Sequence, residues 1–244
     1  MNSIETFKKE VSSNIKKLGA NKKLKKLSLK FIVDSLRDKY IYNFSWLGRP
    51  IIQYPQDMVA VQELIWAIKP DLIIETGIAH GGSLILSASI LELIGGPGKV
   101  VGVDIDIRKH NRKEIEDHRM FKRIILIEGS STEDLVIKKV ARIAKNKKRV
   151  LVFLDSNHTH DHVLKELELY HSFVTKGSYL VIFDTIVEDM PRGKVKNRPW
   201  DKGNNPKTAV LEFLKKNKSF IVDQEIENKL LITSAPNGWL KRVK

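Results

Sequence analysis

Short apolar runs alternate with amphipathic stretches between residues 72 and 184, and this alternation predicts an α/β sheet. Continuous apolar runs are typical of parallel strands buried on both faces, and the stretches between them have helical spacing. The predicted strands are Leu72–Thr76, Val100–Asp104, Ile124–Glu128, Val150–Asp155 and Tyr179–Asp184. The predicted helices between them are Ser83–Ile94, Thr132–Ala144 and His160–Val174. We therefore expect a doubly wound fold, with a mostly parallel sheet covered by helices on both faces.

The flanking segments complete this picture. Apolar residues at helical spacing predict further helices at Phe7–Leu18, Leu24–Leu36, Gln56–Ile68 and Lys207–Lys216. A segment rich in proline and glycine follows Asp184 and has no periodicity, as is typical of a functional loop. Two last strands, Phe220–Asp223 and Lys229–Thr233, are expected to pair as a hairpin and to bring the sheet to seven strands.

Charge divides the chain into two parts. The net charge is +14, and residues 1–40 carry eleven lysines and arginines against four acidic residues. We therefore divide the chain into a basic helical extension, residues 1–50, and a domain formed by residues 51–244. A basic extension of this kind suits an anionic membrane surface or a nucleic acid, and it equally suits a solvated helical face.

Composition excludes several classes of protein. Cysteine is absent, which removes disulfides, thiolate catalysis and cysteine-bound zinc. No apolar run is long enough to span a membrane, and the first residues lack the apolar core of a signal peptide. We expect a cytoplasmic enzyme, with contact to the inner face of the membrane as an option for the basic extension.

The first predicted strand leads into a glycine-rich loop, and an acidic residue lies near the end of that strand. The segment contains Glu75 and Gly77, then Gly81, Gly82 and Ser83 at the start of a helix. Glycines permit tight turns and close approach of a ligand, and a helix N-terminus offers free N–H groups. The phosphate-binding pattern of P-loop proteins is absent, and the spacing differs from that of dinucleotide-binding loops. A carboxylate such as Glu75 favours a ligand bearing a sulfonium and an ammonium group, and it repels a pyrophosphate.

The next two strands end in residues that suit a nucleoside. Asp104 and Asp106 follow the second strand, where an acid accepts hydrogen bonds from ribose hydroxyls. Gly129, Ser130 and Ser131 follow the third strand and form a plausible rim for an adenine ring. Together with the glycine loop, these residues predict a binding site for S-adenosylmethionine.

These motifs resemble a known family. The pattern E-T-G-x-x-x-G-G-S (75–83), V-D-I-D (103–106), G-S-S (129–131), L-D-S-N-H-T-H-D-H-V (154–163), G-S-Y-L-V (177–181) and N-P-x-x-A-V (205–210) is similar to the class I methyltransferases named after cephalosporin hydroxylase, which include rhamnosyl O-methyltransferases. The resemblance implies a Rossmann-like methyltransferase fold. It also implies that Glu75, Gly77, Asp104 and Ser130 contact S-adenosylmethionine and that the methyl group goes to a hydroxyl.

Acidic residues at the fourth and fifth strand ends provide the candidate catalytic site. Asp155 and Asp184 are expected to face the cofactor and to hold Mg²⁺, which lowers the pKa of an acceptor hydroxyl. His158 and His160 are candidates for the general base or for a third metal ligand. The arrangement resembles catechol-type O-methyltransferases, but Phe183 stands where relatives carry a carboxylate, which leaves the metal requirement open. Both acids also suit a simpler role as caps of turns or helices.

The resemblance implies that the methyl acceptor is a hydroxyl of a sugar, a glycolipid or a small molecule. An RNA methyltransferase, or an RNA- or membrane-associated binding protein on the same fold, is the alternative that the basic extension suggests. Nucleic acid is disfavoured because the sequence shows no aromatic-rich platform for bases. A homo-oligomer is compatible with all these interpretations.

Overall fold

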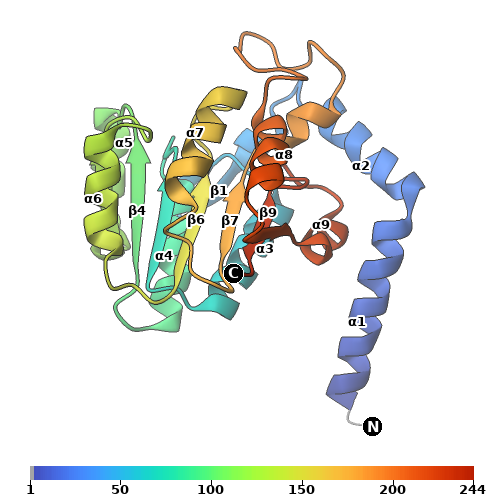
Figure 1. Cartoon of the computed structure of the whole chain (residues 1–244), viewed down its shortest axis with the longest axis horizontal. Coiled ribbons are helices and arrows are strands. Elements are labelled where there is room, and N and C mark those ends of the chain that lie inside the picture. Colours follow the sequence, from blue (N-terminus) through green and yellow to red (C-terminus); the bar gives the residue numbers. More distant parts are fainter. Residues whose placement is uncertain (1–2) are drawn as a thin grey trace.

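The computed structural model describes residues 3–244 and contains the predicted seven-stranded sheet (Figure 1). The strand order is β5-β4-β3-β6-β7-β9-β8, in which β9 runs antiparallel to both of its neighbours and the other pairs are parallel. The strands are β3 (Leu72–Thr76), β4 (Lys99–Asp104), β5 (Ile124–Glu128), β6 (Val150–Leu154), β7 (Tyr179–Ile182), β8 (Phe220–Val222) and β9 (Trp239–Arg242). The expected doubly wound fold is confirmed.

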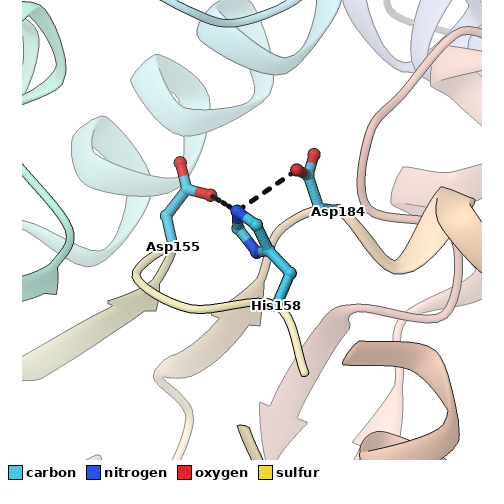
Figure 2. A group of neighbouring side chains, drawn as sticks. All are labelled: Asp155, His158 and Asp184. Carbon is cyan, nitrogen blue, oxygen red and sulfur yellow. Dashed lines mark ion pairs between the residues drawn. The ribbon is translucent and has the colours of Figure 1, made fainter. Parts of the chain in front are cut away.

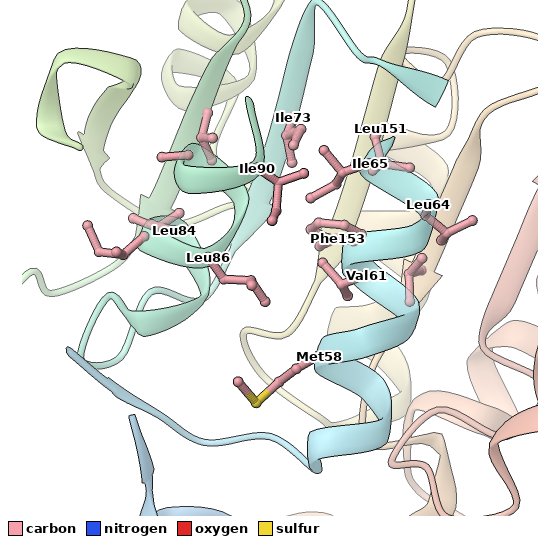
Figure 3. Close-up of a cluster of buried hydrophobic side chains, with 14 of the residues drawn as sticks. Met58, Val61, Leu64, Ile65, Ile73, Leu84, Leu86, Ile90, Leu151 and Phe153 are labelled. Atoms are coloured by element: carbon pink, nitrogen blue, oxygen red, sulfur yellow. The ribbon is translucent and has the colours of Figure 1, made fainter. Parts of the chain in front are cut away.

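Helices cover both faces of this sheet, because successive side chains of a strand point to opposite faces. On β3, Ile73 belongs to one core cluster, whereas Leu72 and Ile74 belong to the other. The first cluster lies under α3 (Pro55–Ile68), α4 (Gly82–Ile94) and α5 (Lys109–Glu116). The second lies under α6 (Asp134–Ala144), α7 (His160–Tyr170) and α8 (Pro206–Lys216). Figure 3 shows α3 and α4 packing their apolar side chains against β3 and β6 in the first cluster.

The N-terminal helices lie beside the sheet, near the edge formed by β9 and β8. They are α1 (Ser3–Ala20) and α2 (Lys22–Ser35), followed by η1 (Tyr40–Asn43) and a small hairpin of β1 (Phe44–Trp46) and β2 (Arg49–Ile51). In Figure 1, α1 extends away from the body of the molecule, and only its C-terminal part approaches α9 (Gln224–Leu230). The hairpin packs against α4, where the indole N–H of Trp46 donates to Ser89 Oγ at 3.0 Å.

The predicted last hairpin is wrong in its second strand. Residues 229–233 do not form a strand, because Asp223 caps a helix by accepting the N–H groups of Glu225 at 3.0 Å and Ile226 at 3.3 Å. The helix continues to Leu230, and the last strand is β9 instead. Trp239 on β9 is fully buried against the sheet, and this tertiary packing outweighs the local strand propensity of residues 229–233.

The irregular segment predicted after Asp184 is present, and regular structure fixes it at both ends. It begins with the short helix η3 (Thr185–Asp189) and ends at Asn205, which caps α8 in a reciprocal capping box with Thr208. A further short helix, η2 (Phe121–Arg123), precedes β5. Among residues 3–244, none of the helices has the length and apolar character that crossing a bilayer requires.

Candidate active site

Register brings the carboxyl ends of the central strands together. Thr76 on β3 pairs with Val103 on β4 and with Leu154 on β6, and Leu154 pairs with Ile182 on β7. The residues that follow these strands therefore lie side by side at one edge of the sheet, as the rule for ligand sites in open α/β sheets requires. The N–H of Asp155 still donates to the carbonyl of Thr76 at 2.9 Å, which holds the end of β6 against the glycine loop.

The glycines of the loop are required by the chain itself. A Cβ atom on Gly77 would lie 2.1 Å from the carbonyl oxygen of Asp155, and the residue has a φ of 85°. A Cβ on Gly81 would meet the Ile115 side chain at 2.4 Å, and one on Gly82 would meet the carbonyl oxygen of Pro50 at 2.3 Å. These close contacts within the protein give Gly81 and Gly82 a packing reason for their small size, in addition to the approach of a ligand that the sequence predicts.

Glu75 is buried at the end of β3, under the glycine loop. Its side chain is 3% exposed, and Oε1 accepts a hydrogen bond from Ser83 Oγ at the start of α4. Burial raises the pKa of Glu75 to about 7, and the bond from Ser83 offsets part of that shift. Among residues 3–244, no cationic side chain forms an ion pair with Glu75, and a buried acid of this kind is suited to a ligand that brings its own positive charge.

Asp104 connects the end of β4 with the glycine loop. Its Oδ2 accepts the N–H of Ile78 at 2.7 Å, and its Oδ1 accepts the N–H of Asp106 at 3.2 Å. Asp106 is exposed, and between the two acids Ile105 leaves 73% of its surface exposed. Large exposed apolar side chains beside a predicted nucleoside site offer a surface for a base. The sequence analysis did not single out Ile105.

In the loop after β5, some side chains lie at the rim of the predicted cofactor site and others face the interior of the protein. Gly129 has a φ of 144°, and Ser130 lies at the rim, where its hydroxyl contacts that of Thr132 at 3.2 Å. Ser131, in contrast, is buried, and its Oγ lies 3.2 Å from Nε2 of His162. The side chain of Ser131 therefore faces the interior, whereas that of Ser130 lies at the rim.

Three predicted residues form a compact cluster beside this site (Figure 2). Nε2 of His158 lies 3.3 Å from Oδ2 of Asp184 and 4.0 Å from Oδ1 of Asp155. One ligand atom from each residue lies within 4.8 Å of the other two. Burial, followed by the nearby negative charge of Asp184, raises the pKa of Asp155 well above its ordinary value. Two carboxylates and an imidazole at this separation are donors that suit a divalent cation.

Phe183 is absent from the cluster. Its ring is 3% exposed and packs in the first core cluster, with ring centroids 6.1 Å from Phe153 and 6.0 Å from Trp239. The next residue, Asp184, has a left-handed backbone with φ 56°, at the start of η3. The third donor beside Asp155 and Asp184 is thus His158, and the cluster has three candidate ligands without any contribution from position 183.

His160 points elsewhere. Its Nδ1 lies 2.8 Å from Oγ1 of Thr208, and its Nε2 lies 3.3 Å from Oε2 of Glu212, both on α8. Its backbone N–H donates to Oδ1 of Asn204 at 2.9 Å. The structure therefore does not bring His160 to the cluster, and it gives the residue a role in joining α7 to α8.

A buried polar network lies behind the cluster, and the sequence did not reveal it. Ser156 Oγ donates to Oε1 of Glu166 at 2.7 Å, and His162 Nε2 lies 3.2 Å from Ser156 Oγ. The side chain of Glu166 is 1% exposed, and its Oε2 has no hydrogen-bond partner among residues 3–244. The network fixes the turn that carries Asp155 and His158, because Ser156 lies between them.

The sheet order, the glycine loop and the acids at the strand ends define a class I methyltransferase. The family described as Rhamnosyl O-methyltransferase/CmcI matches residues 38–243, and the chain belongs to it. A rhamnosyl O-methyltransferase of Mycobacterium tuberculosis is 32% identical over 190 residues, which are 76% of this chain and 73% of that protein. The corresponding enzyme of Mycobacterium leprae is 31% identical over 155 residues, 62% of this chain and 65% of that protein.

A solved structure has the same fold. The structure of CmcI with magnesium and S-adenosylmethionine has a TM-score of 0.58 and 17% sequence identity, and it covers 83% of this chain and 78% of that one. The solved structure confirms the fold. The family match and the relatives confirm the resemblance that the sequence motifs indicated and the assignment of this chain to the methyltransferases.

Proposed function

We propose that this protein transfers the methyl group of S-adenosylmethionine to a hydroxyl of a sugar, with the help of a divalent cation. One observation carries the proposal: the Asp155–His158–Asp184 cluster lies at the same sheet edge as Glu75 and Asp104. The names of the relatives, rhamnosyl O-methyltransferases, support a rhamnosyl or similar sugar as the acceptor.

The residues of the cofactor side fit S-adenosylmethionine. The buried Glu75 complements a ligand with a sulfonium and an ammonium group, and Asp104 is an acceptor for ribose hydroxyls. Ile105 provides an exposed apolar surface next to Asp104, and Ser130 lies at the rim of the neighbouring loop. The backbone around these residues is shaped by Asp106, Gly81, Gly82 and Ser83. Ser83 also positions Glu75, because its hydroxyl donates a hydrogen bond to that carboxylate.

The cluster on the acceptor side fits a divalent cation such as Mg²⁺. Asp155 and Asp184 bring two acidic side chains close together, and the structure places no lysine or arginine of residues 3–244 within 4.0 Å of either one. A bound cation lowers the pKa of an acceptor hydroxyl and so makes the oxygen more nucleophilic. Within this arrangement His158 completes the donor set, or it accepts the proton that the hydroxyl loses.

Titration calorimetry tests the cofactor assignment. Native protein should bind S-adenosylmethionine and should not bind NADH. Asp104→Ala should weaken S-adenosylmethionine binding by about 1–3 kcal/mol, the cost of leaving polar groups unsatisfied. The matched variant Asp106→Ala, which leaves the contact to Ile78 in place, should have a smaller effect. Unchanged affinity in Asp104→Ala would remove that residue from the proposed site.

We also propose that α1 and α2 contact an anionic membrane surface. Exposed apolar residues lie on both helices: Phe7 is 64%, Leu27 52% and Phe31 40% exposed. Lysines surround them, and residues 1–40 carry eleven basic residues. Apolar side chains flanked by lysines on a helix are the combination that binds at the headgroup layer of an anionic bilayer. A sugar acceptor carried by a lipid would be presented at such a surface.

A further inference from the structure

The loop between η3 and α8, residues 190–204, lies next to the cluster and has no role in the function proposed so far. It is anchored at both ends. Glu188 on η3 accepts the N–H of Gly203 at 2.7 Å and the side-chain amide of Asn205 at 2.6 Å. Asp201 accepts the N–H of Gly193 at 2.8 Å, which closes the loop on itself. Figure 1 shows the loop near the end of α2, and its Val195 packs against a buried cluster that includes Ile32 of that helix.

This loop places an aromatic ring against the cluster. The indole of Trp200 meets the imidazole of His158 edge to face, with ring centroids 4.8 Å apart and an interplanar angle of 84°. Trp200 is only partly buried, so part of its surface is available beside the cluster. The C–H-rich face of a sugar ring packs well on an aromatic side chain, because the face of the aromatic ring is a flat apolar surface.

The same loop is strongly basic. It carries five exposed cationic side chains and a single acid, Asp201; the cations are Arg192, Lys194, Lys196, Arg198 and Lys202. Within residues 3–244, none of the five lies within the 4.0 Å that defines an ion pair with a carboxylate, Asp155 and Asp184 included. The cations therefore do not neutralise the acidic cluster by contact.

One of these cations is coupled to the aromatic ring. The guanidinium of Arg198 lies over the ring of Trp200 at 5.3 Å from its centroid. Stacking on the ring orients the guanidinium and leaves its N–H groups available, and an arginine binds phosphate or carboxylate through two parallel hydrogen bonds. The pair thus combines an apolar surface for a sugar ring with donors for an anion a short distance from it.

We propose that residues 190–204 form an acceptor subsite for an anionic glycan, in which Trp200 packs on the sugar ring and Arg198 and its basic neighbours bind a phosphate or carboxylate of the acceptor. The inference rests on the proposed function and specifies its substrate class. A neutral sugar gives no reason for five exposed cations on the loop whose Trp200 contacts His158, whereas an anionic acceptor is attracted to that loop and oriented there.

Probe binding tests the subsite. The full-length protein, with Mg²⁺ and S-adenosylhomocysteine present, is titrated with L-rhamnose 1-phosphate, methyl β-D-glucuronide and methyl α-L-rhamnoside. We expect at least one of the two anionic probes to bind tenfold or more tightly than the neutral rhamnoside, and the difference to shrink as salt is raised. The two anionic arms separate a phosphate from a carboxylate. Equal affinity for all three probes, or no measurable binding of any, overturns the inference.

Matched variants locate the effect. The fourfold change Arg192→Gln, Lys194→Gln, Lys196→Gln and Arg198→Gln should remove the preference for the anionic probe. The control removes the same number of exposed positive charges elsewhere: Lys138→Gln, Lys139→Gln, Lys145→Gln and Lys148→Gln. The control should retain the preference, and its loss there would show a nonspecific effect of net charge and contradict the subsite.

The aromatic component has its own variants. Trp200→Ala should weaken all sugar probes at least fivefold, and Trp200→Phe should restore most of the affinity. S-adenosylhomocysteine binding, measured in the same samples, should stay unchanged in both. Failure of the native protein to bind that cofactor product would refute the proposed function, whereas normal cofactor binding without a preference for anionic probes would refute the subsite alone. Loss of vesicle binding by the fourfold variant with unchanged probe affinity would identify the loop as a lipid contact instead.

Discussion

Nε2 of His158 lies 3.3 Å from Oδ2 of Asp184, although the two residues are separated by α7 and β7 in the chain. Each follows the carboxyl end of its own strand, His158 after β6 and Asp184 after β7, and the parallel pairing of Leu154 with Ile182 brings those ends together. Because Phe183 turns into the core, this contact supplies the third donor of the proposed cation site.

The first prediction concerns the cation. Asp184→Asn and His158→Ala should each weaken Mg²⁺ or Mn²⁺ binding at least tenfold, since each removes a ligand from the cluster. Calorimetric titration with each metal measures this, and turnover should fall in EDTA and return with Mg²⁺. The control Asp161→Asn removes an exposed acid of α7 and should bind metal normally. Full activity of Asp184→Asn in EDTA would refute the metal proposal.

The second prediction concerns Glu75 and pH. Its pKa is raised to about 7 in the folded protein, above the ordinary value of 4.5, so the protonated form is favoured by folding. The contribution to stability is fully present below pH 4.5 and is lost as pH rises through about 7, by up to about 3 kcal/mol. Glu75→Gln should therefore flatten the free energy of unfolding of the ligand-free protein between pH 5 and 8, as measured by urea denaturation.

Cofactor affinity should follow the same titration with the opposite sign. The ionised carboxylate attracts the positively charged S-adenosylmethionine, so native affinity should rise as pH increases through about 7, and Glu75→Gln should bind weakly at every pH. Asp57 is the control, because burial raises its pKa to about 6 and it bonds to Ser234 away from the glycine loop. Asp57→Asn should alter the stability curve without altering the affinity curve.

The third prediction concerns Phe183. Truncation to alanine should cost about 3–5 kcal/mol of unfolding free energy, because the ring is buried between Phe153 and Trp239. Phe183→Leu should cost less, and Phe7→Ala on the exposed stripe of α1 should stay within about 0.5 kcal/mol of the native protein. Denaturant titration measures all three. A stable Phe183→Ala variant with altered metal affinity would place the ring in the site after all.

The fourth prediction concerns the N-terminal helices. Native protein should bind vesicles of phosphatidylcholine and phosphatidylglycerol in sedimentation, and binding should weaken as salt is raised. Phe7→Glu with Phe31→Glu should abolish it. The control Leu93→Glu with Leu211→Glu changes two other exposed apolar residues, on α4 and α8, and should bind normally. If the Phe7 and Phe31 variant instead converts a dimer into a monomer and native protein ignores vesicles, a second copy of the chain covers these helices.

Local pattern was sufficient for most of the fold. Strands buried on both faces require uninterrupted apolar runs, so β3 and β5 begin and end where the sequence predicted, and β6 and β7 end just before the predicted Asp155 and Asp184. The acids at those ends were recognisable because ligand sites gather at the carboxyl ends of parallel strands. Sequence alone thus determined the five parallel strands of the sheet, the methyltransferase class and the acids of the candidate site.

Tertiary structure decided what depends on contacts between distant residues. Residues 229–233 form no strand because β9 takes that place, and Gly81 and Gly82 are small because Ile115 and Pro50 pack against them. Two histidines lie in one short motif, but only His158 contacts the acids of the cluster, whereas His160 contacts Thr208 on α8. Trp200 reaches the cluster because its loop, anchored by Glu188, brings the indole against His158. Spacing along the chain does not specify which way a side chain turns beyond a strand, since that direction is set by the neighbours it meets.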